Sequence, residues 1–246
     1  MPYIAGRNVV LEAIRAGQRV QRLLVDSAVG TQDREVHDLL EAAVQARVPI
    51  DRVRRARLDA IHPRHQGVAA EVQAFAYAPF ARLKERAAEG ADAALVLALD
   101  ALQDPQNFGS LLRTALAVGA TGVVLPERRA VGVTPAVVRS SAGAAEYLAI
   151  SQVPNLTRAL DELKEVGLWV VGLDVRGGSP YDETDLRGPL VVVVGSEGTG
   201  IGRLVRDHCD LLVHIPMSGP TESLNAAVAG SILLYHVFRQ RVHGGR

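Results

Sequence analysis

The first 75 residues contain short hydrophobic patterns of two kinds. Apolar residues recur at helical spacing over residues 6–17 and 33–47, which predicts two amphipathic helices. Residues 22–26 and 68–75 instead have the apolar content or the alternation that is typical of strands. We therefore predict a small α/β unit over residues 1–75.

From residue 93 onward, nearly continuous runs of Val and Leu alternate with amphipathic helices. The runs are LVLALD (95–100), GVVL (122–125), LWVVGLD (168–174), LVVVVG (190–195) and LLVHIP (211–216). Because such runs are apolar on both faces, they predict strands of a parallel sheet that helices cover on each side. Residues 93–246 are thus expected to form a second α/β domain.

The segment between the two domains, residues 76–92, has a different character. It is rich in Ala and charged residues, is punctuated by Pro79 and Gly90, and has no sustained apolar stripe. We interpret it as a linker, and the total of 246 residues accommodates two domains of ordinary size.

Composition excludes several classes of protein. No apolar run reaches the ~18 residues that a bilayer crossing needs, and the first ten residues lack a signal-peptide pattern, so we expect a cytoplasmic protein without membrane contact. A single cysteine, Cys209, cannot form an intrachain disulfide or a CxxC metal site, so we expect no metal. We expect its thiol to be buried. The formal net charge of +0 means that any RNA-binding site must be a local patch.

Ligands of parallel α/β sheets bind beyond the carboxyl ends of the strands, so the segment after each run is a candidate for chemistry. After LVLALD, Asn107 lies where a helix is expected to begin, and Arg113 follows within that helix. An amide and a guanidinium near a helix N-terminus can bind a phosphate or a ribose edge. A helix cap with a solvated arginine would account for the same two residues.

The segment after LVVVV reads GSEGTGIG, residues 195–202. Its glycines allow backbone to approach a ligand closely, although a plain tight turn is the alternative. The spacing matches neither the dinucleotide fingerprint nor the phosphate loop, which requires a lysine where Ile201 stands. Because Glu197 would repel a phosphate, a ligand with a positive centre fits this loop better.

The segment after LLVHI contains Met217, Ser223 and Asn225 and leads into a long apolar helix that we expect to begin at Glu222. Capping of that helix would explain one of the polar residues. Capping does not explain the presence of Met217, Ser223 and Asn225 together in a loop at the same sheet edge as the glycine-rich segment.

These three segments together resemble the motifs of the SpoU family of SPOUT methyltransferases. The motifs are NxGxxxRTA from Asn107, GxEGxG from Gly195, and IPM followed by SLN from Ile215, and the resemblance covers roughly residues 93–240. One departure is Ala226 and Ala227 after SLN, where many members have Val-Ser.

The resemblance implies a C-terminal domain with a trefoil knot and S-adenosylmethionine bound largely by backbone. The implied cofactor-binding residues are Leu173, Gly195, Ile215, Met217 and Leu224. The catalytic residues that match the family pattern are Asn107, Arg113, Glu197, Ser223 and Asn225. We expect Arg113 to bind the target phosphate and stabilise the forming alkoxide, because arginine does not give up its proton to act as a base.

The N-terminal portion is similar to the ribosomal-protein-like domain that precedes the knotted domain in rRNA-modifying members. Its RNA-binding candidates are Arg7, Asn8, Arg54, Arg55 and His65, although a solvated charged face is the alternative for the arginines. The resemblance favours guanosine of 23S rRNA as the substrate, and it implies a homodimer through the last helix, about residues 222–240. Burial of that helix within one subunit would give the same pattern.

Other functions remain open at the level of sequence. A tRNA ribose methyltransferase is one alternative, and an rRNA adenosine 2'-O-methyltransferase that confers antibiotic resistance is another. A nucleotide-dependent α/β enzyme or a non-catalytic RNA-binding protein would lie outside this activity altogether.

Overall fold

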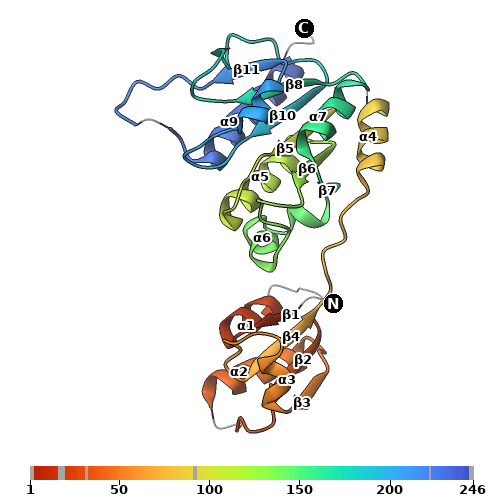
Figure 1. The fold of residues 1–246 in the computed structure, drawn as a ribbon, viewed down its shortest axis with the longest axis vertical. Coiled ribbons are helices and arrows are strands. Elements are labelled where there is room, and N and C mark those ends of the chain that lie inside the picture. The colour runs from red at the N-terminus through yellow and green to blue at the C-terminus, as the bar shows by residue number, and fades with distance from the viewer. Residues whose placement is uncertain (1–2, 16–19, 31–32, 91–92, 222, 244–246) are drawn as a thin grey trace. The chain divides into compact units, whose positions relative to one another are not determined.

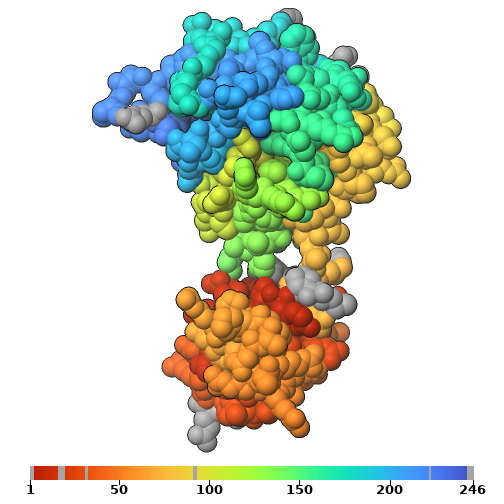
Figure 2. All heavy atoms as spheres, in the orientation of Figure 1, coloured from red at the N-terminus to blue at the C-terminus, as the bar shows by residue number. Residues whose placement is uncertain are grey.

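The structure is a computed structural model that describes residues 3–15, 20–30, 33–90, 93–221 and 223–243. The chain divides into two units, Met1–Ala76 and Tyr77–Arg246. Each unit has its own sheet and its own hydrophobic core (Figure 1). In the space-filling view, the atoms of each unit close over that core (Figure 2).

The first unit is a four-stranded mixed sheet with three helices. Its elements are β1 (Tyr3–Ala5), α1 (Arg7–Arg15), β2 (Val20–Asp26), α2 (Arg34–Gln45), β3 (Ile50–Val53), α3 (Arg55–Asp59) and β4 (Val68–Val72). The strand order is β1-β4-β2-β3, in which β2 and β3 are parallel and β4 is antiparallel to both of its neighbours. The expected helices and strands are all present, and the very short β1, β3 and α3 are additional.

The two long helices of this unit bury the apolar stripes that predicted them. Val10 and Ile14 of α1 pack with Val36 and Leu39 of α2 in the main core. A smaller cluster around Leu58 of α3 covers the other side of the sheet. The unit therefore stabilises itself by burial on both faces.

The second unit is built on a seven-stranded sheet in which every pairing is parallel. Its strands are β5 (Leu95–Leu99), β6 (Gly122–Pro126), β7 (Ile150–Val153), β8 (Trp169–Leu173), β9 (Ser179–Pro180), β10 (Leu190–Val194) and β11 (Leu211–His214). Its helices are α4 (Phe80–Glu89), α5 (Pro105–Ala117), α6 (Pro135–Ser140), the 3₁₀ helix η2 (Ala144–Glu146), α7 (Leu156–Lys164), α8 (Arg203–Asp207) and α9 (Ala226–His243). The predicted parallel α/β domain is confirmed.

The order of strands in this sheet is β7-β6-β5-β10-β8-β11-β9, so β10 lies between two earlier strands. Alternate residues of β10 face opposite helix layers. Val191 and Val193 share a core cluster with α4, α7 and α8, whereas Val194 contacts α9 at Gly230. The continuous valine run thus reflects burial on both faces of the central strand.

The linker expected over residues 76–92 is not what the structure shows. Phe80–Glu89 form α4, and Leu83 and Ala87 of this helix are buried in the core of the second unit. Two apolar residues one turn apart are enough to hold a short helix on a sheet, although they are too few to form a recognisable apolar stripe. Residues 91–92 lie outside the described part of the chain.

The last helix is fixed at its far end by side chains that reach the amino ends of the strands. Arg241 donates hydrogen bonds to the carbonyl oxygens of Ala93 at 2.7 Å, Ala94 at 3.0 Å and Gly188 at 2.6 Å. Burial lowers the pKa of the Arg241 guanidinium. No helix among the described residues combines the length and the hydropathy needed to span a membrane.

We predict that Gly109→Ala destabilises the second unit by about 1–3 kcal/mol, because overpacking displaces neighbouring backbone. A Cβ atom at Gly109 would lie 2.7 Å from the backbone carbon of Ser140, where α5 meets α6. The measurement is urea unfolding monitored by circular dichroism. Gly188→Ala is the control, since a Cβ atom at Gly188 would have no neighbour within 4 Å. Equal unfolding midpoints for the two variants would contradict the prediction.

Candidate active site

The carboxyl ends of three neighbouring strands, β10, β8 and β11, together with the segment before α9, enclose a cavity of about 360 Å³. Backbone and apolar side chains form much of its wall, and two carboxylates lie among them. The lining residues are Leu173, Asp174, Val175, Arg176, Val194, Gly195, Ser196, Glu197, Gly198, Thr199, Gly200, Ile215, Met217, Ser223, Leu224, Ala226 and Ala229.

All five residues expected to bind a cofactor line this cavity. They are Leu173, Gly195, Ile215, Met217 and Leu224. They come from the ends of three different strands and from the segment that follows the last of them. The sheet-edge rule accounts for this convergence, since parallel strands deliver their carboxyl ends to one edge.

The glycine-rich loop folds back tightly on itself at the rim of the cavity. Ser196 and Gly200 exchange backbone hydrogen bonds of 3.1 and 2.9 Å, and Gly198 and Gly200 have φ of +79° and +67°. A Cβ atom at Gly195 would collide with the carbonyl group of Gly200. Glycine is therefore required here both for close approach and for left-handed backbone.

Three side chains from three distant segments form one hydrogen-bonded cluster beside the cavity. Glu197 Oε1 accepts hydrogen bonds from Asn107 Nδ2 and, at 2.9 Å, from Asn225 Nδ2. Asn225 Nδ2 also donates to Asn107 Oδ1 at 3.0 Å. The cluster links α5, the glycine-rich loop and the start of α9, and it aligns a carboxylate with the cavity wall.

Asn225 has a second role that corrects the expected helix boundary. Its Oδ1 accepts hydrogen bonds from the backbone N–H groups of Ala227 and Val228 at 3.0 and 3.2 Å, so it caps α9. The helix begins at Ala226 rather than at residue 222, and Ser223 and Leu224 are not helical. Residue 222 itself lies outside the described residues.

Asn107, in contrast to Asn225, lies inside its helix and does not cap it. Asp104 caps α5 by accepting a hydrogen bond from the N–H of Gln106 at 3.1 Å, and Pro105 begins the helix. Asn107 is buried in the first turn and faces Glu197. Its amide therefore belongs to the internal cluster and not to a solvent-facing helix end.

The remaining two catalytic candidates, Ser223 and Arg113, differ in position. Ser223 lines the cavity. Arg113 is exposed on α5, is not part of the cavity wall, and makes no side-chain hydrogen bond or ion pair with another described residue. Its guanidinium is thus available to a ligand that approaches from solvent.

The sequence reasoning missed Asp174, which is buried in the cavity wall directly after β8. Its Oδ1 accepts the N–H of Arg176 at 2.8 Å, and its Oδ2 pairs with Arg206 of α8. Burial alone would raise the pKa of this carboxyl, but hydrogen bonds from Arg176 and the charge of Arg206 lower it below the ordinary value. The sequence signal that could have identified Asp174 is its position at the end of the LWVVGLD run.

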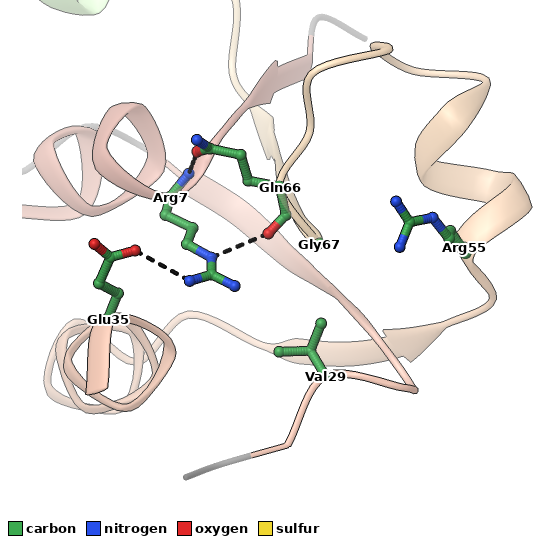
Figure 3. Close-up of a pocket in the computed structure, with 6 residues that line it drawn as sticks. All are labelled: Arg7, Val29, Glu35, Arg55, Gln66 and Gly67. Carbon is green, nitrogen blue, oxygen red and sulfur yellow. Dashed lines mark hydrogen bonds and ion pairs between the residues drawn. The ribbon is translucent and has the colours of Figure 1, made fainter. Parts of the chain in front are cut away.

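The RNA-binding candidates of the first unit divide into exposed and internally bonded residues. Asn8, Arg54 and Arg55 are exposed. Arg7 instead contacts Asp33 at 2.7 Å and Glu35 at 3.0 Å, so its charge is matched by two carboxylates within the unit. Figure 3 shows the contact with Glu35.

His65 is buried, and both of its ring nitrogens have partners. Nδ1 accepts the N–H of Gly67 at 2.9 Å, and Nε2 lies 3.0 Å from Asp59 Oδ1. This geometry holds the loop before β4 in place. An imidazole in that position has no free nitrogen to offer to RNA.

The described residues contain no cluster of His, Cys, Asp and Glu side chains that could hold a metal ion. Cys209 is partly buried against Val205, and burial raises the pKa of its thiol to about 12. The thiol is therefore protonated at neutral pH and is a poor nucleophile.

Replacing Asp174 should destabilise the protein in a pH-dependent way. Asp174→Asn leaves Arg206 without its buried partner, and we expect a loss of about 1.5–3 kcal/mol at pH 7. Because the folded pKa is lowered, the wild-type advantage is present above the unfolded pKa of ~3.9 and is lost as the pH falls through the folded value.

Urea unfolding of wild type and variant at pH 7 and at successively lower pH values measures this difference. Asp207→Asn, an exposed carboxylate at the end of α8, is the matched control and should change stability little. A difference between wild type and Asp174→Asn that stays constant down to the acid transition would refute the assignment.

Relatives of known name cover nearly the whole chain. A Bacillus subtilis (strain 168) protein named putative TrmH family tRNA/rRNA methyltransferase YacO is 42% identical over 240 residues, which are 97% of this chain and 96% of the relative. An uncharacterized tRNA/rRNA methyltransferase of Mycolicibacterium smegmatis is 44% identical over 97% of this chain and 76% of its own length.

Solved structures of similar fold also cover nearly the whole chain. The SpoU methyltransferase AviRb from Streptomyces viridochromogenes, in complex with the cofactor AdoMet, is 27% identical with a TM-score of 0.65 and covers 99% of this chain and 91% of its own. A structure described as an RNA 2'-O ribose methyltransferase is 26% identical with a TM-score of 0.56, over 98% of this chain and 88% of its own.

Family comparison assigns each unit. Residues 3–78 match the family described as RNA 2'-O ribose methyltransferase substrate binding, which corresponds to the first unit. Residues 94–235 match the SpoU rRNA Methylase family and contain the cavity, the glycine-rich loop and the Asn107–Glu197–Asn225 cluster. This chain therefore belongs to the SpoU rRNA methylase family and is an RNA methyltransferase.

Proposed function

We propose that this protein transfers the methyl group of S-adenosylmethionine to the 2'-hydroxyl of a guanosine ribose in 23S rRNA. The observation that carries the proposal is the convergence of three sequence motifs on one cavity. Gly195 and Ser223 line that cavity, and Asn107 bonds to Glu197 in its wall. A donor and a ribose can be brought together only where such segments meet.

The residues of the cavity fit S-adenosylmethionine. Its apolar wall, with Leu173, Ile215 and Leu224, suits an adenine ring, and the glycine-rich backbone permits close contact. Glu197, whose carboxylate accepts hydrogen bonds from two amides, adds negative charge, which a sulfonium tolerates and a phosphate does not. When bound, this cofactor supplies an activated methyl group as the electrophile.

The chain's own residues would orient the acceptor and help to remove its proton. Positioning of the reactants can lower the activation free energy by ~7–11 kcal/mol, and this effect depends on rigid side chains. The Asn107–Glu197–Asn225 cluster supplies such rigidity, because each member is hydrogen-bonded to the other two. Ser223 in the cavity wall then lies with the cluster beside the ribose.

Arg113 would bind the phosphate of the target nucleotide and stabilise the alkoxide that forms as the proton leaves. Its exposed guanidinium, which has no partner among the described residues, supports this role. A free cation at the edge of a site is well suited to charge that develops in the transition state.

The first unit supports rRNA over tRNA as the substrate. It matches a substrate-binding family over residues 3–78. The family resemblance stated above further implies that such a domain precedes the knotted domain in rRNA-modifying members, whereas tRNA-modifying members usually lack it. An rRNA substrate is consistent with a cytoplasmic location of the protein. The alternatives are a tRNA ribose, and an rRNA adenosine whose methylation confers antibiotic resistance.

We also propose that the protein forms a homodimer through α9. This helix carries exposed apolar side chains at Val228, Tyr235 and Val242, which recur every seventh residue and so form one stripe. Phe238 lies beside Tyr235, with ring centroids 6.1 Å apart. A continuous apolar stripe on an 18-residue helix is typical of a packed interface rather than of a solvated face.

The family resemblance further implies that the second unit is knotted. The insertion of β10 between β5 and β8, and the packing of α9 against α5 and β10, are compatible with a chain that threads through its own loops. The knot would hold the segment from Ile215 to Leu224 against the cavity.

The direct test is methylation of purified 23S rRNA and tRNA, followed by mass spectrometry of the nucleosides. We predict 2'-O-methylguanosine from 23S rRNA, and a loss of about 10²-fold or more in kcat for Arg113→Ala with unchanged cofactor affinity by calorimetry. Arg86→Ala, an exposed arginine on α4, is the control. Near-normal turnover of Arg113→Ala would exclude the assigned role, and product from tRNA alone would exclude the substrate.

Light scattering after size-exclusion chromatography tests the dimer. We predict a dimer for the wild type and a monomer for the double variant Val228→Asp with Tyr235→Asp, because two buried charges oppose an apolar interface. Leu204→Asp introduces a charge at an exposed apolar residue of α8 and should remain dimeric. A monomeric wild type, or a double variant that stays dimeric, would rule out this interface.

A further inference from the structure

The first unit contains a cavity at the edge of its own sheet. It has a volume of about 360 Å³ and is lined by Arg7, Val29, Glu35, Arg55, Gln66 and Gly67 (Figure 3). The carboxyl ends of β1, β2 and β3 and the start of β4 meet at this edge, since β4 is antiparallel to its neighbours. As in the second unit, the strand ends deliver polar groups to one place.

The charged groups around this cavity balance one another. Arg7 contacts both Asp33 and Glu35, and Arg55 approaches the buried carboxylate of Asp26 at 4.0 Å. Arg52, the third guanidinium, donates to the carbonyl oxygen of Val29 at 2.7 Å. Three carboxylates thus accompany three guanidinium groups, and a phosphate entering here would meet repulsion as well as attraction.

One of these carboxylates has unused hydrogen-bonding capacity. Asp26 is 1% exposed, and its Oδ1 accepts the N–H of Ala28 at 3.0 Å. Its Oδ2 has no hydrogen-bond partner among the described residues. Leaving a buried charged acceptor unpaired costs free energy, and such a group in a native structure requires an explanation.

Gln66 contributes the complementary polar group. Its Oε1 accepts the backbone N–H of Arg7 at 3.1 Å, so the side-chain amide is held with its Nε2 donors free of any described partner. Gly67, with φ of +81°, leaves room between this amide and Val29, where a Cβ atom would lie 2.8 Å from the valine methyl group. The cavity wall therefore combines a donor and an apolar contact, and the Asp26 acceptor lies behind Arg55.

We infer that this cavity binds a single unstacked nucleobase of the RNA substrate. A nucleobase is uncharged and flat, with apolar faces and donor and acceptor groups on its edges, which matches a charge-balanced cavity with Val29 and Gln66 in its wall and Asp26 behind the lining residues Arg55 and Gly67. Asp26 Oδ2 lies 4.0 Å from the exposed Arg55 side chain, and movement of that side chain would let an N–H donor of the base reach it. This inference rests on the proposed function, because it presumes an RNA substrate.

The phosphate groups of the same RNA would bind elsewhere on this unit. Arg54 and Arg57 of the α3 region are exposed and do not line the cavity. Contacts to phosphate are independent of sequence and weaken with salt, whereas contacts to a base edge depend on which base is present. The two contributions can therefore be separated by experiment.

Fluorescence anisotropy with the full-length chain provides the test. The probes are stem-loop RNAs of one stem, whose seven loop nucleotides are all G, all A, all C, all U or all abasic. We expect the preferred base to bind about tenfold more tightly than the abasic loop, as for one hydrogen bond to a charged group. Equal affinity for all five loops would overturn the inference.

Two conservative variants identify the groups involved. Asp26→Asn keeps the acceptor for Ala28 but replaces Oδ2 by a donor, and Gln66→Glu keeps the acceptor for Arg7 but removes the donors. Each should reduce the preference over the abasic loop to less than about twofold, with thermal unfolding confirming the fold. Preference unchanged in both variants would exclude the cavity.

Arg57→Ala is the matched control, since Arg57 is an exposed arginine of the same unit that does not line the cavity. It should weaken binding to every loop, the abasic one included, by the same factor and so leave the preference intact. A preference lost in Arg57→Ala would contradict the assignment of base recognition to the cavity. Calorimetry of S-adenosylmethionine with the wild type tests the proposed function separately, because the loop preference does not depend on the cavity of the second unit.

Discussion

The active site of this protein depends on the carboxylate of Glu197. It lies in a loop whose close approach of backbone at residue 195 requires glycine. Its oxygen accepts hydrogen bonds from the side-chain amides of Asn107, in the first turn of α5, and of Asn225, which caps α9. A carboxylate accepts several hydrogen bonds at once, so one side chain can align three segments that are far apart in sequence. The same interaction leaves a negative charge beside a cavity that suits a cationic donor.

The helices that deliver these amides are held by equally local constraints. Gly230 of α9 allows close contact with Leu111 of α5 and with Val194 of β10, and the hydroxyl groups of Thr114 and Ser231 meet at 2.8 Å. Arg241 fixes the far end of α9 to three carbonyl oxygens. The positions of Asn107 and Asn225 are therefore set by packing over the whole length of two helices, which is the kind of support that a preorganised site needs.

Both units use the edge of a sheet in the same way, but with different charge. In the second unit, Glu197 brings a negative charge to the cavity wall, the charge of Asp174 is matched by Arg176 and Arg206, and Arg113 stands outside the wall as a free cation. In the first unit, carboxylates and guanidinium groups neutralise one another, and His65 and Arg7 serve the internal structure of the loop before β4. The two proposed ligands, a charged donor and an RNA base, would thus meet different electrostatic environments in one chain.

The sequence by itself determined the α/β class and five strands of the second unit, because valine-rich runs are local signals. Its motifs, through the family resemblance, also implied five of the residues that line the cavity of that unit. The sequence left out α3, α4, β1, β3, β7 and β9, whose apolar patterns are too short to stand above the background. It also misplaced the start of α9, since a capping asparagine and a helical residue look alike without coordinates. Only the tertiary structure decided the cluster of Asn107, Glu197 and Asn225 and the pairing of Asp174 with Arg206. The same holds for Asp26 Oδ2, which has no hydrogen-bond partner among the described residues. Each of these depends on groups that distant segments bring within hydrogen-bonding distance, and no local pattern of residues encodes such a distance.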